Sequence, residues 1–215
     1  MVTGAYDHIW DCCCDHGLLG AKLLERQAAH CIHFVDIVPS LMAQLETKLQ
    51  RFYPDSTSQW LTHCIDVAQL PLHKFPGKHL IIIAGVGGDL MASFITSIHR
   101  QSPDIEFDFL LCPVHHTFTL RQTLIKFNYQ LKSEVLLKDN QRFYEVLHVT
   151  GDITDPNPVH PVGCQIWQSK NEHQKAVINQ YLQSLLNHYN RIQSGEARQV
   201  QHVIQAYNEV ASNKA

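Results

Sequence analysis

The sequence predicts a doubly wound α/β sheet followed by a pair of C-terminal helices. Three observations lead to this fold class. Short apolar runs alternate with amphipathic stretches of helical period as far as Phe127, as expected of parallel strands connected by helices. Two further strand-like runs then flank a tight turn, and the chain after residue 164 shows helical periodicity alone.

The strands are predicted from apolar runs that end at turn-forming residues. They lie at residues 8–11, 31–36, 59–64, 78–84, 107–112, 131–137 and 142–150. The run from His79 to Ile83 is apolar enough to be buried on both faces, which is typical of a parallel sheet. The last two strands flank Asp139-Asn140 and are expected to form an antiparallel hairpin at the sheet edge.

Helices are predicted between the strands and after them. The first four lie at residues 20–29, from Pro39 to Leu49, from Asp89 onward and at 119–127. Glycines and prolines punctuate residues 151–164, beyond which Ser194-Gly195 separates two apolar helical stripes. We therefore expect a main domain over residues 1–152, a linker over 153–164 and a helical hairpin over 165–215. The hairpin is either a packing arm or a substrate-gripping arm.

Composition and charge describe an ordinary globular protein of 215 residues, with 45% hydrophobic and 17% charged residues. The formal net charge of -3 gives no overall signal for nucleic acid, so an RNA partner would need local basic patches. The seven cysteines include no C-x-x-C pair, which excludes zinc-ribbon spacing and favours buried thiols in a reducing compartment. The sequence shows no signal peptide and no membrane-spanning run, so we expect a cytoplasmic protein with no membrane and no metal partner.

The first strand runs into a turn that contains Asp11, Asp15, His16 and Gly17. A strand, a tight turn and a helix at the carboxyl end of a parallel sheet form the usual grip on a nucleotide-type cofactor. Asp11 is expected to anchor this turn through backbone N–H groups or to bind an amino group of the cofactor. Asp15 and His16 would point toward the reacting group, although a turn-forming acid and a helix-starting histidine are the simpler interpretations.

Two more acidic residues follow predicted strands on the same edge. Asp36 ends the second strand, 19 residues after Gly17, where a carboxylate can accept both ribose hydroxyls of a nucleoside cofactor. Ile37 beside it is assigned to the same site. Asp66 follows the third strand, where a carboxylate can accept the hydrogens of an adenine amino group. Each acid taken alone also fits a loop or helix-capping role.

A glycine-rich turn, Ala84-Gly85-Val86-Gly87-Gly88, follows the most buried strand. Its glycines let a ligand approach the backbone closely and supply N–H groups at a helix start, so Ala84, Gly85 and Gly87 are predicted to line the cofactor site. The turn is not a phosphate-binding P-loop, because no Lys-Ser or Lys-Thr follows it. His115 and His116 follow Pro113 at the end of the fifth strand, on the same rim. They could bind a metal, but 15 histidines are spread along the chain and we expect none to do so.

Taken together, these motifs resemble those of the bacterial tRNA adenine-22 N1-methyltransferases. The matching segments are Asp11-Cys12-Cys13-Cys14-Asp15-His16, Asp36, Ala84-Gly85-Val86-Gly87-Gly88, Leu111-Cys112-Pro113-Val114, Leu120-Arg121 and Tyr144-Glu145-Val146. The resemblance spans residues 8–150 and extends loosely into the helical hairpin. It implies a Rossmann-like class I methyltransferase fold, a seven-stranded sheet with an antiparallel last strand, S-adenosyl-L-methionine as methyl donor and tRNA as acceptor.

The resemblance also implies roles for residues of the rim. Asp15 and His16 would be catalytic, with the Asp15 carboxylate stabilising the cation that N1-methylation of adenine creates. The cofactor would be held by Asp11, Cys13, Gly17, Asp36, Ile37, Asp66, Ala84, Gly85 and Gly87. The acceptor would be held by His115, His116, Arg121 and Tyr144.

Three departures from that family concern the substrate more than the fold. Cys13 replaces a family glycine in the first turn, so the backbone there must suit a side chain or the donor must sit differently. Val114 replaces a family asparagine, which leaves the target base to His115 or His116. The helix before the first strand is nearly missing, which leaves open a start upstream of Met1.

Two further questions stay open at the level of sequence. The basic residues either form an RNA-binding surface or decorate an ordinary solvated face. They are Arg121, Lys126, Lys132, Lys138 and Arg142, and on the arm Lys170, Lys175, Arg191 and Arg198. The alternative functions are a methyltransferase for another RNA or a small molecule, and a non-catalytic protein that binds S-adenosyl-L-methionine and forms a homodimer through its arm.

Overall fold

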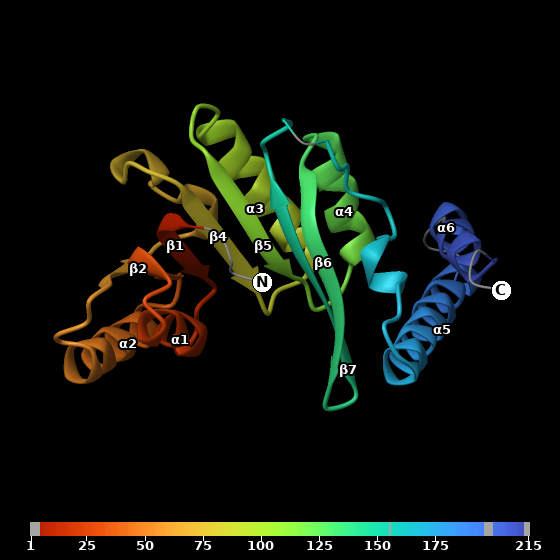
Figure 1. Ribbon diagram of the computed structural model, residues 1–215, viewed down its shortest axis with the longest axis horizontal. Helices are drawn as coiled ribbons and strands as arrows, with labels where there is room; N and C mark the ends of the chain where they lie inside the picture. The colour runs from red at the N-terminus through yellow and green to blue at the C-terminus, as the bar shows by residue number, and fades with distance from the viewer. Residues whose placement is uncertain (1–4, 155, 196–199, 213–215) are drawn as a thin grey trace.

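The computed structural model describes residues 5–154, 156–195 and 200–212 and centres on one seven-stranded sheet (Figure 1). The strands are β1 (Tyr6–Cys12), β2 (Ala29–Asp36), β3 (Gln59–Cys64), β4 (His79–Ala84), β5 (Phe107–Cys112), β6 (Gln130–Asp139) and β7 (Arg142–Thr150). Their order is β3-β2-β1-β4-β5-β7-β6, in which β7 is antiparallel to both neighbours and every other pair is parallel. The predicted α/β fold with its antiparallel last strand is confirmed.

Helices cover both faces of the sheet. They are α1 (Leu18–Glu25), α2 (Pro39–Phe52), α3 (Gly88–Gln101), α4 (Thr117–Lys126), α5 (Glu172–Ser194) and α6 (Gln201–Ser212), with short 3₁₀ turns η1 (Val67–Gln69), η2 (Leu72–Lys74) and η3 (Gln165–Trp167). Ile82 of β4 joins the buried cluster under α1 and α2, whereas its neighbours Ile81 and Ile83 join the cluster under α3 and α4. This alternation buries β4 on both faces, as its apolar sequence predicts.

The strand order reverses between β1 and β4. β1 continues outward to β2 and β3, and β4 continues in the other direction to β5. In open α/β sheets, a crevice forms outside the carboxyl ends of the strands at such a point, and ligands bind there. The loops after β1 and β4 are the two that flank this crevice, and both carry predicted cofactor residues.

Two local boundaries differ from the predictions. The first helix, expected over residues 20–29, ends at Glu25 because Gln27 adopts a left-handed φ of 51°, and β2 therefore starts at Ala29. The hairpin turn lies at Asn140-Gln141, one residue later than expected. Both turn residues are left-handed, which is the type I′ geometry that joins twisted antiparallel strands.

The predicted helical hairpin is present as α5 and α6, which lie beyond β6 at one end of the molecule (Figure 1). Its buried faces also pack on the sheet domain: Leu136 of β6 clusters with Tyr181 of α5, and Phe118 of α4 clusters with Tyr207 of α6. The boundary expected at residues 153–164 stays a prediction. Among the described residues, no helix combines the length and apolar character needed to cross a bilayer.

Candidate functional site

Asp11 ties the loop after β1 to the start of α1. Its Oδ2 accepts a hydrogen bond of 2.8 Å from the backbone N–H of Gly20, and the residue is 4% exposed. Burial raises the pKa of Asp11 to about 6, although the Gly20 N–H acts in the opposite direction. Of the two roles expected for this carboxylate, the hydrogen bonding fits the anchoring of the turn.

The loop after β1 keeps a glycine-like backbone at a cysteine. Cys13 has a φ of 56°, Asp15 a φ of 48° and Gly17 a φ of 71°. A left-handed conformation costs a residue with a side chain roughly 1–2 kcal/mol. The backbone at Cys13 therefore lies in the region that favours glycine, although a thiol side chain occupies the position.

Asp36 bridges the loops that follow β1 and β2. Its Oδ2 accepts from the backbone N–H of Asp15 at 3.1 Å, and its Oδ1 accepts from Val38 N–H at 3.1 Å. Asp66 caps η1 by accepting from Ala68 N–H at 2.8 Å. Asp66 thus caps η1, Asp36 ties two loops together without capping α2, and each carboxylate still has acceptor capacity for a ligand.

The predicted cofactor acids converge around one side chain. Burial is the main cause that raises the pKa of the Cys13 thiol to about 11, and the charges of Asp36, Asp11 and Asp66 raise it further. Asp11, Asp36 and Asp66, near the carboxyl ends of β1, β2 and β3, therefore all lie close enough to Cys13 for their charges to act on its thiol. Ile37 beside them is 64% exposed and presents an apolar surface at this edge.

The glycine turn after β4 serves two different purposes. Gly85 has a φ of 79°, and a Cβ atom there would meet no other atom within 4 Å, so its backbone borders open space. A Cβ atom at Gly87 would instead lie 2.3 Å from the His115 ring, and one at Gly88 would lie 2.3 Å from the His116 carbonyl oxygen. Gly85 can thus admit a ligand, whereas Gly87 and Gly88 allow the loop after β5 to pack closely.

Asp15 and His16 lie on the rim with open surroundings. Their side chains are 66% and 53% exposed, and His16 Nε2 lies 3.8 Å from Asp15 Oδ1. An acceptor could approach both of them from solvent. The structure leaves their predicted catalytic roles as a proposal.

A cavity of about 220 Å³ lies between the loop after β5 and helix α5. Imidazole, phenol and guanidinium groups line it, and we call it the arm cavity. Its polar lining includes His115, His116, Tyr181, His188, Tyr189 and Arg191. Burial lowers the pKa of His188, and the nearby Arg191, His116 and His115 lower it further. His116 Nδ1 is also hydrogen-bonded to Asp89 Oδ2 at the start of α3.

A substrate-gripping arm was one of the two roles predicted for the helical hairpin, but the residues through which it lines this cavity were not predicted. Tyr189 belongs to the first of the two apolar helical stripes, and Arg191 was assigned either to an RNA-binding surface or to an ordinary solvated face. Periodicity places both on α5, but it does not show that α5 faces His115, which depends on how the chain packs after β7. The cluster of histidines and tyrosines on α5 was the only signal available.

Tyr144 does not reach the arm cavity. Phe143 and Glu145, its neighbours on β7, both line it. Successive side chains of a strand point to opposite faces, so Tyr144 lies on the other face of the sheet. Tyr144 is therefore not part of the arm cavity, and its predicted contact with an acceptor stays a prediction.

Arg121 is a buried structural residue, and its predicted role in binding the acceptor is wrong. Its side chain is 0% exposed, and Nη2 donates to Glu134 Oε2 at 2.7 Å and to Glu145 Oε2 at 2.6 Å. Nη1 donates to the carbonyl oxygen of His160 at 3.2 Å. A guanidinium that is fully enclosed by these acceptors has no surface to offer to a phosphate.

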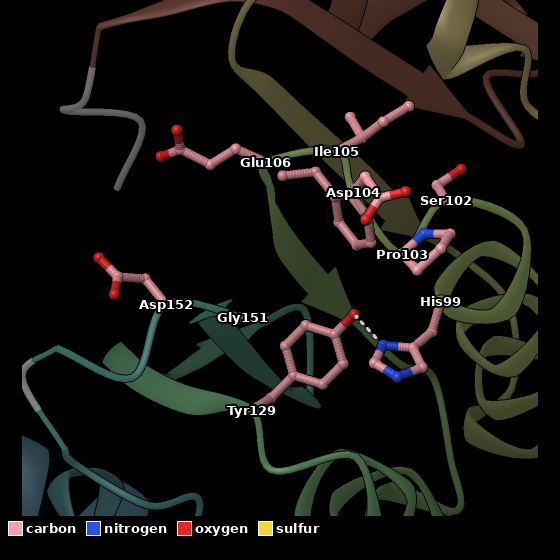
Figure 2. Close-up of a pocket in the computed structure, with 10 residues that line it drawn as sticks. His99, Ser102, Pro103, Asp104, Ile105, Glu106, Tyr129, Gly151 and Asp152 are labelled. Atoms are coloured by element: carbon pink, nitrogen blue, oxygen red, sulfur yellow. Dashed lines mark hydrogen bonds between the residues drawn. The ribbon is translucent and has the colours of Figure 1, made fainter.

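Another cavity lies at the opposite edge of the sheet. It measures about 510 Å³ and is bordered by His99, Tyr129 and the segments 102–107 and 151–152 (Figure 2). Tyr129 Oη and His99 Nδ1 lie 3.4 Å apart within it. These segments precede β5 and follow the antiparallel β7, so the cavity is remote from the carboxyl ends where the predicted cofactor residues gather.

The fold and the acid-lined carboxyl edge define a class of protein. A sequence model described as "Methyltransferase domain" matches residues 1–147, and the chain belongs to this family. A search among curated protein sequences finds none that matches this chain.

Solved structures share the fold at low sequence identity. TrmK of M. capricolum, in complex with S-adenosyl-homocysteine, is 16% identical with a TM-score of 0.70, and the match covers 96% of this chain and 87% of that one. The B. subtilis M1A22 tRNA methyltransferase TrmK is 19% identical with a TM-score of 0.61, covering 99% and 90%. Magnesium protoporphyrin IX methyltransferase from Synechocystis, with bound SAM, is 16% identical with a TM-score of 0.53, covering 68% and 70%.

Proposed function

We propose that this protein transfers the methyl group of S-adenosyl-L-methionine to N1 of an adenine in tRNA. The observation that carries the proposal is the convergence of three carboxylates and the open Gly85 backbone at the carboxyl edge of a methyltransferase domain. The relatives described as TrmK match over nearly the whole chain, the helical arm included, whereas the porphyrin methyltransferase matches over 68% of it. This difference favours tRNA over a small-molecule acceptor.

The donor would lie across the loops after β1 to β4. Asp36 would accept the ribose hydroxyls, Asp66 the adenine amino hydrogens, and Ile37 would pack against the adenine ring. Gly85 leaves the space that the donor needs beside the backbone. Asp11 would hold the first turn in place, and the bound donor would supply an activated methyl group on its sulfonium.

The acceptor would enter from the side of the arm cavity. His115 and His116 belong both to this cavity and to the loop that packs on the glycine turn, so the two sites share a wall. Tyr189 offers an aromatic face, and base–aromatic stacking contributes about 1–3 kcal/mol per base. Arg191 adds a positive charge for phosphate. The target adenine would first leave its stack at a cost of a few kcal/mol.

Methylation at N1 needs alignment more than acid–base chemistry. The N1 lone pair lies in the ring plane and attacks without prior deprotonation, so positioning can lower the barrier by about 7–11 kcal/mol. The product base is a cation. Asp15, exposed on the rim, would stabilise the charge that develops on the adenine.

The predicted basic surface is smaller than the sequence indicated. Arg121 is buried, and Lys132 Nζ donates to the buried Asp108 at 2.8 Å. Arg198 lies outside the described residues. The RNA contacts would therefore lie on the arm around Arg191. The protein would act in the cytoplasm, and a homodimer through the arm remains a prediction.

Methyl transfer to tRNA tests this proposal. The protein is incubated with S-adenosyl-L-methionine labelled in its methyl group and with bulk tRNA, ribosomal RNA or no RNA, and the RNA is then digested to nucleosides. Labelled N1-methyladenosine in the tRNA sample alone is the expected result. Label in ribosomal RNA, or in a nucleoside other than N1-methyladenosine, would show that the proposed acceptor is wrong. Absence of label with intact donor binding would favour a non-catalytic protein.

A further inference from the structure

Three potential metal ligands lie together in the interior, on the two strands that lead to the cofactor loops. His8 is on β1, and Cys31 and His33 are on β2, with His8 opposite Cys31 in the parallel register. Their ligand atoms all lie within 4.8 Å of one another. The three residues are 7%, 2% and 0% exposed, so no solvent-facing surface accounts for their proximity.

We propose that His8, Cys31 and His33 bind a soft d¹⁰ metal ion, Zn²⁺ or Cu⁺, that joins β1 to β2. One thiolate and two imidazoles are the ligands that these two ions prefer, and no carboxylate is among them. His8 Nδ1 and His33 Nε2 are 3.0 Å apart. Two nitrogens on a tetrahedral zinc, each at about 2.0–2.1 Å, are about 3.3 Å apart, so the pair has to open only slightly.

The remaining ring nitrogens already have the partners that metal-bound histidines use. His8 Nε2 lies 3.2 Å from the carbonyl oxygen of Pro76, and His33 Nδ1 lies 2.9 Å from His63 Nε2. In metal sites the second ring nitrogen typically donates to a carbonyl or another acceptor, which orients the ring. With the metal on His8 Nδ1 and His33 Nε2, both second nitrogens carry hydrogens and both point at acceptors.

The protonation changes balance within the cluster. Without metal, His33 Nε2–H donates to His8 Nδ1, and His63 Nε2–H donates to His33 Nδ1. Metal binding moves the His33 proton to Nδ1 and the His63 proton to its own Nδ1, while Cys31 releases its thiol proton to solvent as the metal–sulfur bond forms. One proton is thus released for each ion bound.

Burial acts in opposite directions on the two kinds of ligand: it favours the neutral imidazole that a metal needs and disfavours the thiolate, whose formation the metal ion itself has to drive. Burial lowers the pKa of His33 to about 2, with help from His63, His8 and His79, so this imidazole is neutral at physiological pH. It raises the pKa of Cys31 to about 11, and the Cys31 thiol makes no hydrogen bond within the described part of the chain. A metal ion would therefore give the thiol the partner that it lacks. By joining β1 to β2, it would also stabilise the strands that end in the cofactor loops.

Metal binding by the untagged full-length protein tests the proposal. The chelator-treated protein is titrated separately with Zn²⁺ and, under reductant, with Cu⁺, while metal content, thermal midpoint and proton release are measured. Co²⁺ serves as an optical probe of zinc coordination. We expect one tightly held Zn²⁺ or Cu⁺ per chain, a higher thermal midpoint, and a thiolate-to-cobalt charge-transfer band; the ion that survives dialysis identifies the native one.

Three variants separate this site from adventitious binding. Cys31→Ala should abolish the cobalt band and weaken binding at least about 100-fold, more than the loss of an outer partner costs. His63→Ala, at a partly exposed residue, should weaken binding about 10–100-fold with an unchanged circular dichroism spectrum. Cys14→Ala removes a buried thiol outside the cluster and should leave binding intact. Failure to bind any of the three ions, or full binding by Cys31→Ala, would overturn the proposal.

Discussion

Replacing Arg121 by methionine should destabilise the protein strongly, because it leaves two carboxylates buried without their cation. Glu134 and Glu145 are 0% and 1% exposed, and the guanidinium donates to both of them. Breaking a buried ion pair by removing one partner typically costs about 3–5 kcal/mol. In a protein of this size, a loss of 1 kcal/mol in the free energy of unfolding lowers the thermal midpoint by about 2–4 °C, so the midpoint should fall by about 6–20 °C.

The loss of stability in Arg121→Met should extend to the helical arm. The same carboxylates hold it: Glu134 Oε1 accepts from the backbone N–H groups of Cys164 and Gln165 at 2.6 and 2.7 Å, and Glu145 Oε1 accepts from Tyr181 Oη at 2.6 Å. Urea unfolding followed by circular dichroism measures the stability change. Protection of α5 amides in hydrogen exchange reports whether the arm loosens first.

The difference in the free energy of unfolding between the wild type and Arg121→Met should become smaller at acidic pH. Burial alone would raise the pKa of Glu134, but the Arg121 guanidinium and two backbone N–H groups outweigh burial and lower it from 4.5. Its contribution to wild-type stability is therefore present above about pH 4.5 and is lost as the pH falls through the lowered pKa. The Arg121→Met variant lacks the cation and is relieved by protonation, so the two stability curves should converge below pH 4.5.

A matched substitution in the same helix controls for the loss of positive charge. Lys126→Met removes an exposed cation from the last turn of α4 and should change the free energy of unfolding by less than about 0.5 kcal/mol. If Arg121→Met instead lost less than about 1 kcal/mol while its affinity for tRNA fell, the assignment of Arg121 as a structural residue would be wrong.

Four substitutions test the rim. Asp36→Ala should weaken binding of S-adenosyl-L-methionine at least about 100-fold in calorimetry, since charge-assisted hydrogen bonds contribute about 1.5–3 kcal/mol each; undiminished affinity would mean that the ribose lies elsewhere. Asp15→Asn, which tolerates the left-handed backbone, should preserve donor affinity and lower the rate of methyl transfer at least about 10-fold; full activity would remove Asp15 from the mechanism. Asp11→Asn should raise the free energy of unfolding at pH 7 by up to about 3 kcal/mol. The reason is that the stability contributed by the Asp11 carboxyl is present below pH 4 and is lost as the pH rises through its pKa of about 6. A lower stability of the variant in urea titrations would contradict this. Cys13→Gly should change stability by no more than about 1 kcal/mol, as relief of the left-handed backbone is offset by chain entropy, and should retain donor affinity; a weaker complex would show that the thiol itself contacts the donor.

The sheet and the position of its rim were predictable because they depend on local patterns. Apolar runs such as that of β4 mark buried strands, and the carboxyl ends of parallel strands meet at one edge whatever the details of packing. Asp11, Asp36 and Asp66 could therefore be brought together from their positions alone. The predicted anchoring role of Asp11 needed only the expectation that a helix starts nearby.

Arg121 and Tyr144 could not be placed in this way. An arginine on a helix ordinarily lies on the surface, and its burial depends on Glu134 and Glu145 approaching from two other strands. The face that Tyr144 occupies depends on which side of β7 the arm covers. The left-handed backbone at Cys13 is equally hidden, because a cysteine at such a position contradicts the usual residue preference.

Transfer of a labelled methyl group to tRNA by the wild-type protein, compared with Asp36→Ala under the same conditions, tests the central claim most directly. The account predicts labelled N1-methyladenosine with the wild type and at most background label with the variant, at donor concentrations below the variant's dissociation constant. Equal transfer by both proteins would contradict the donor site. Tight donor binding with no label in any RNA would contradict the proposed reaction.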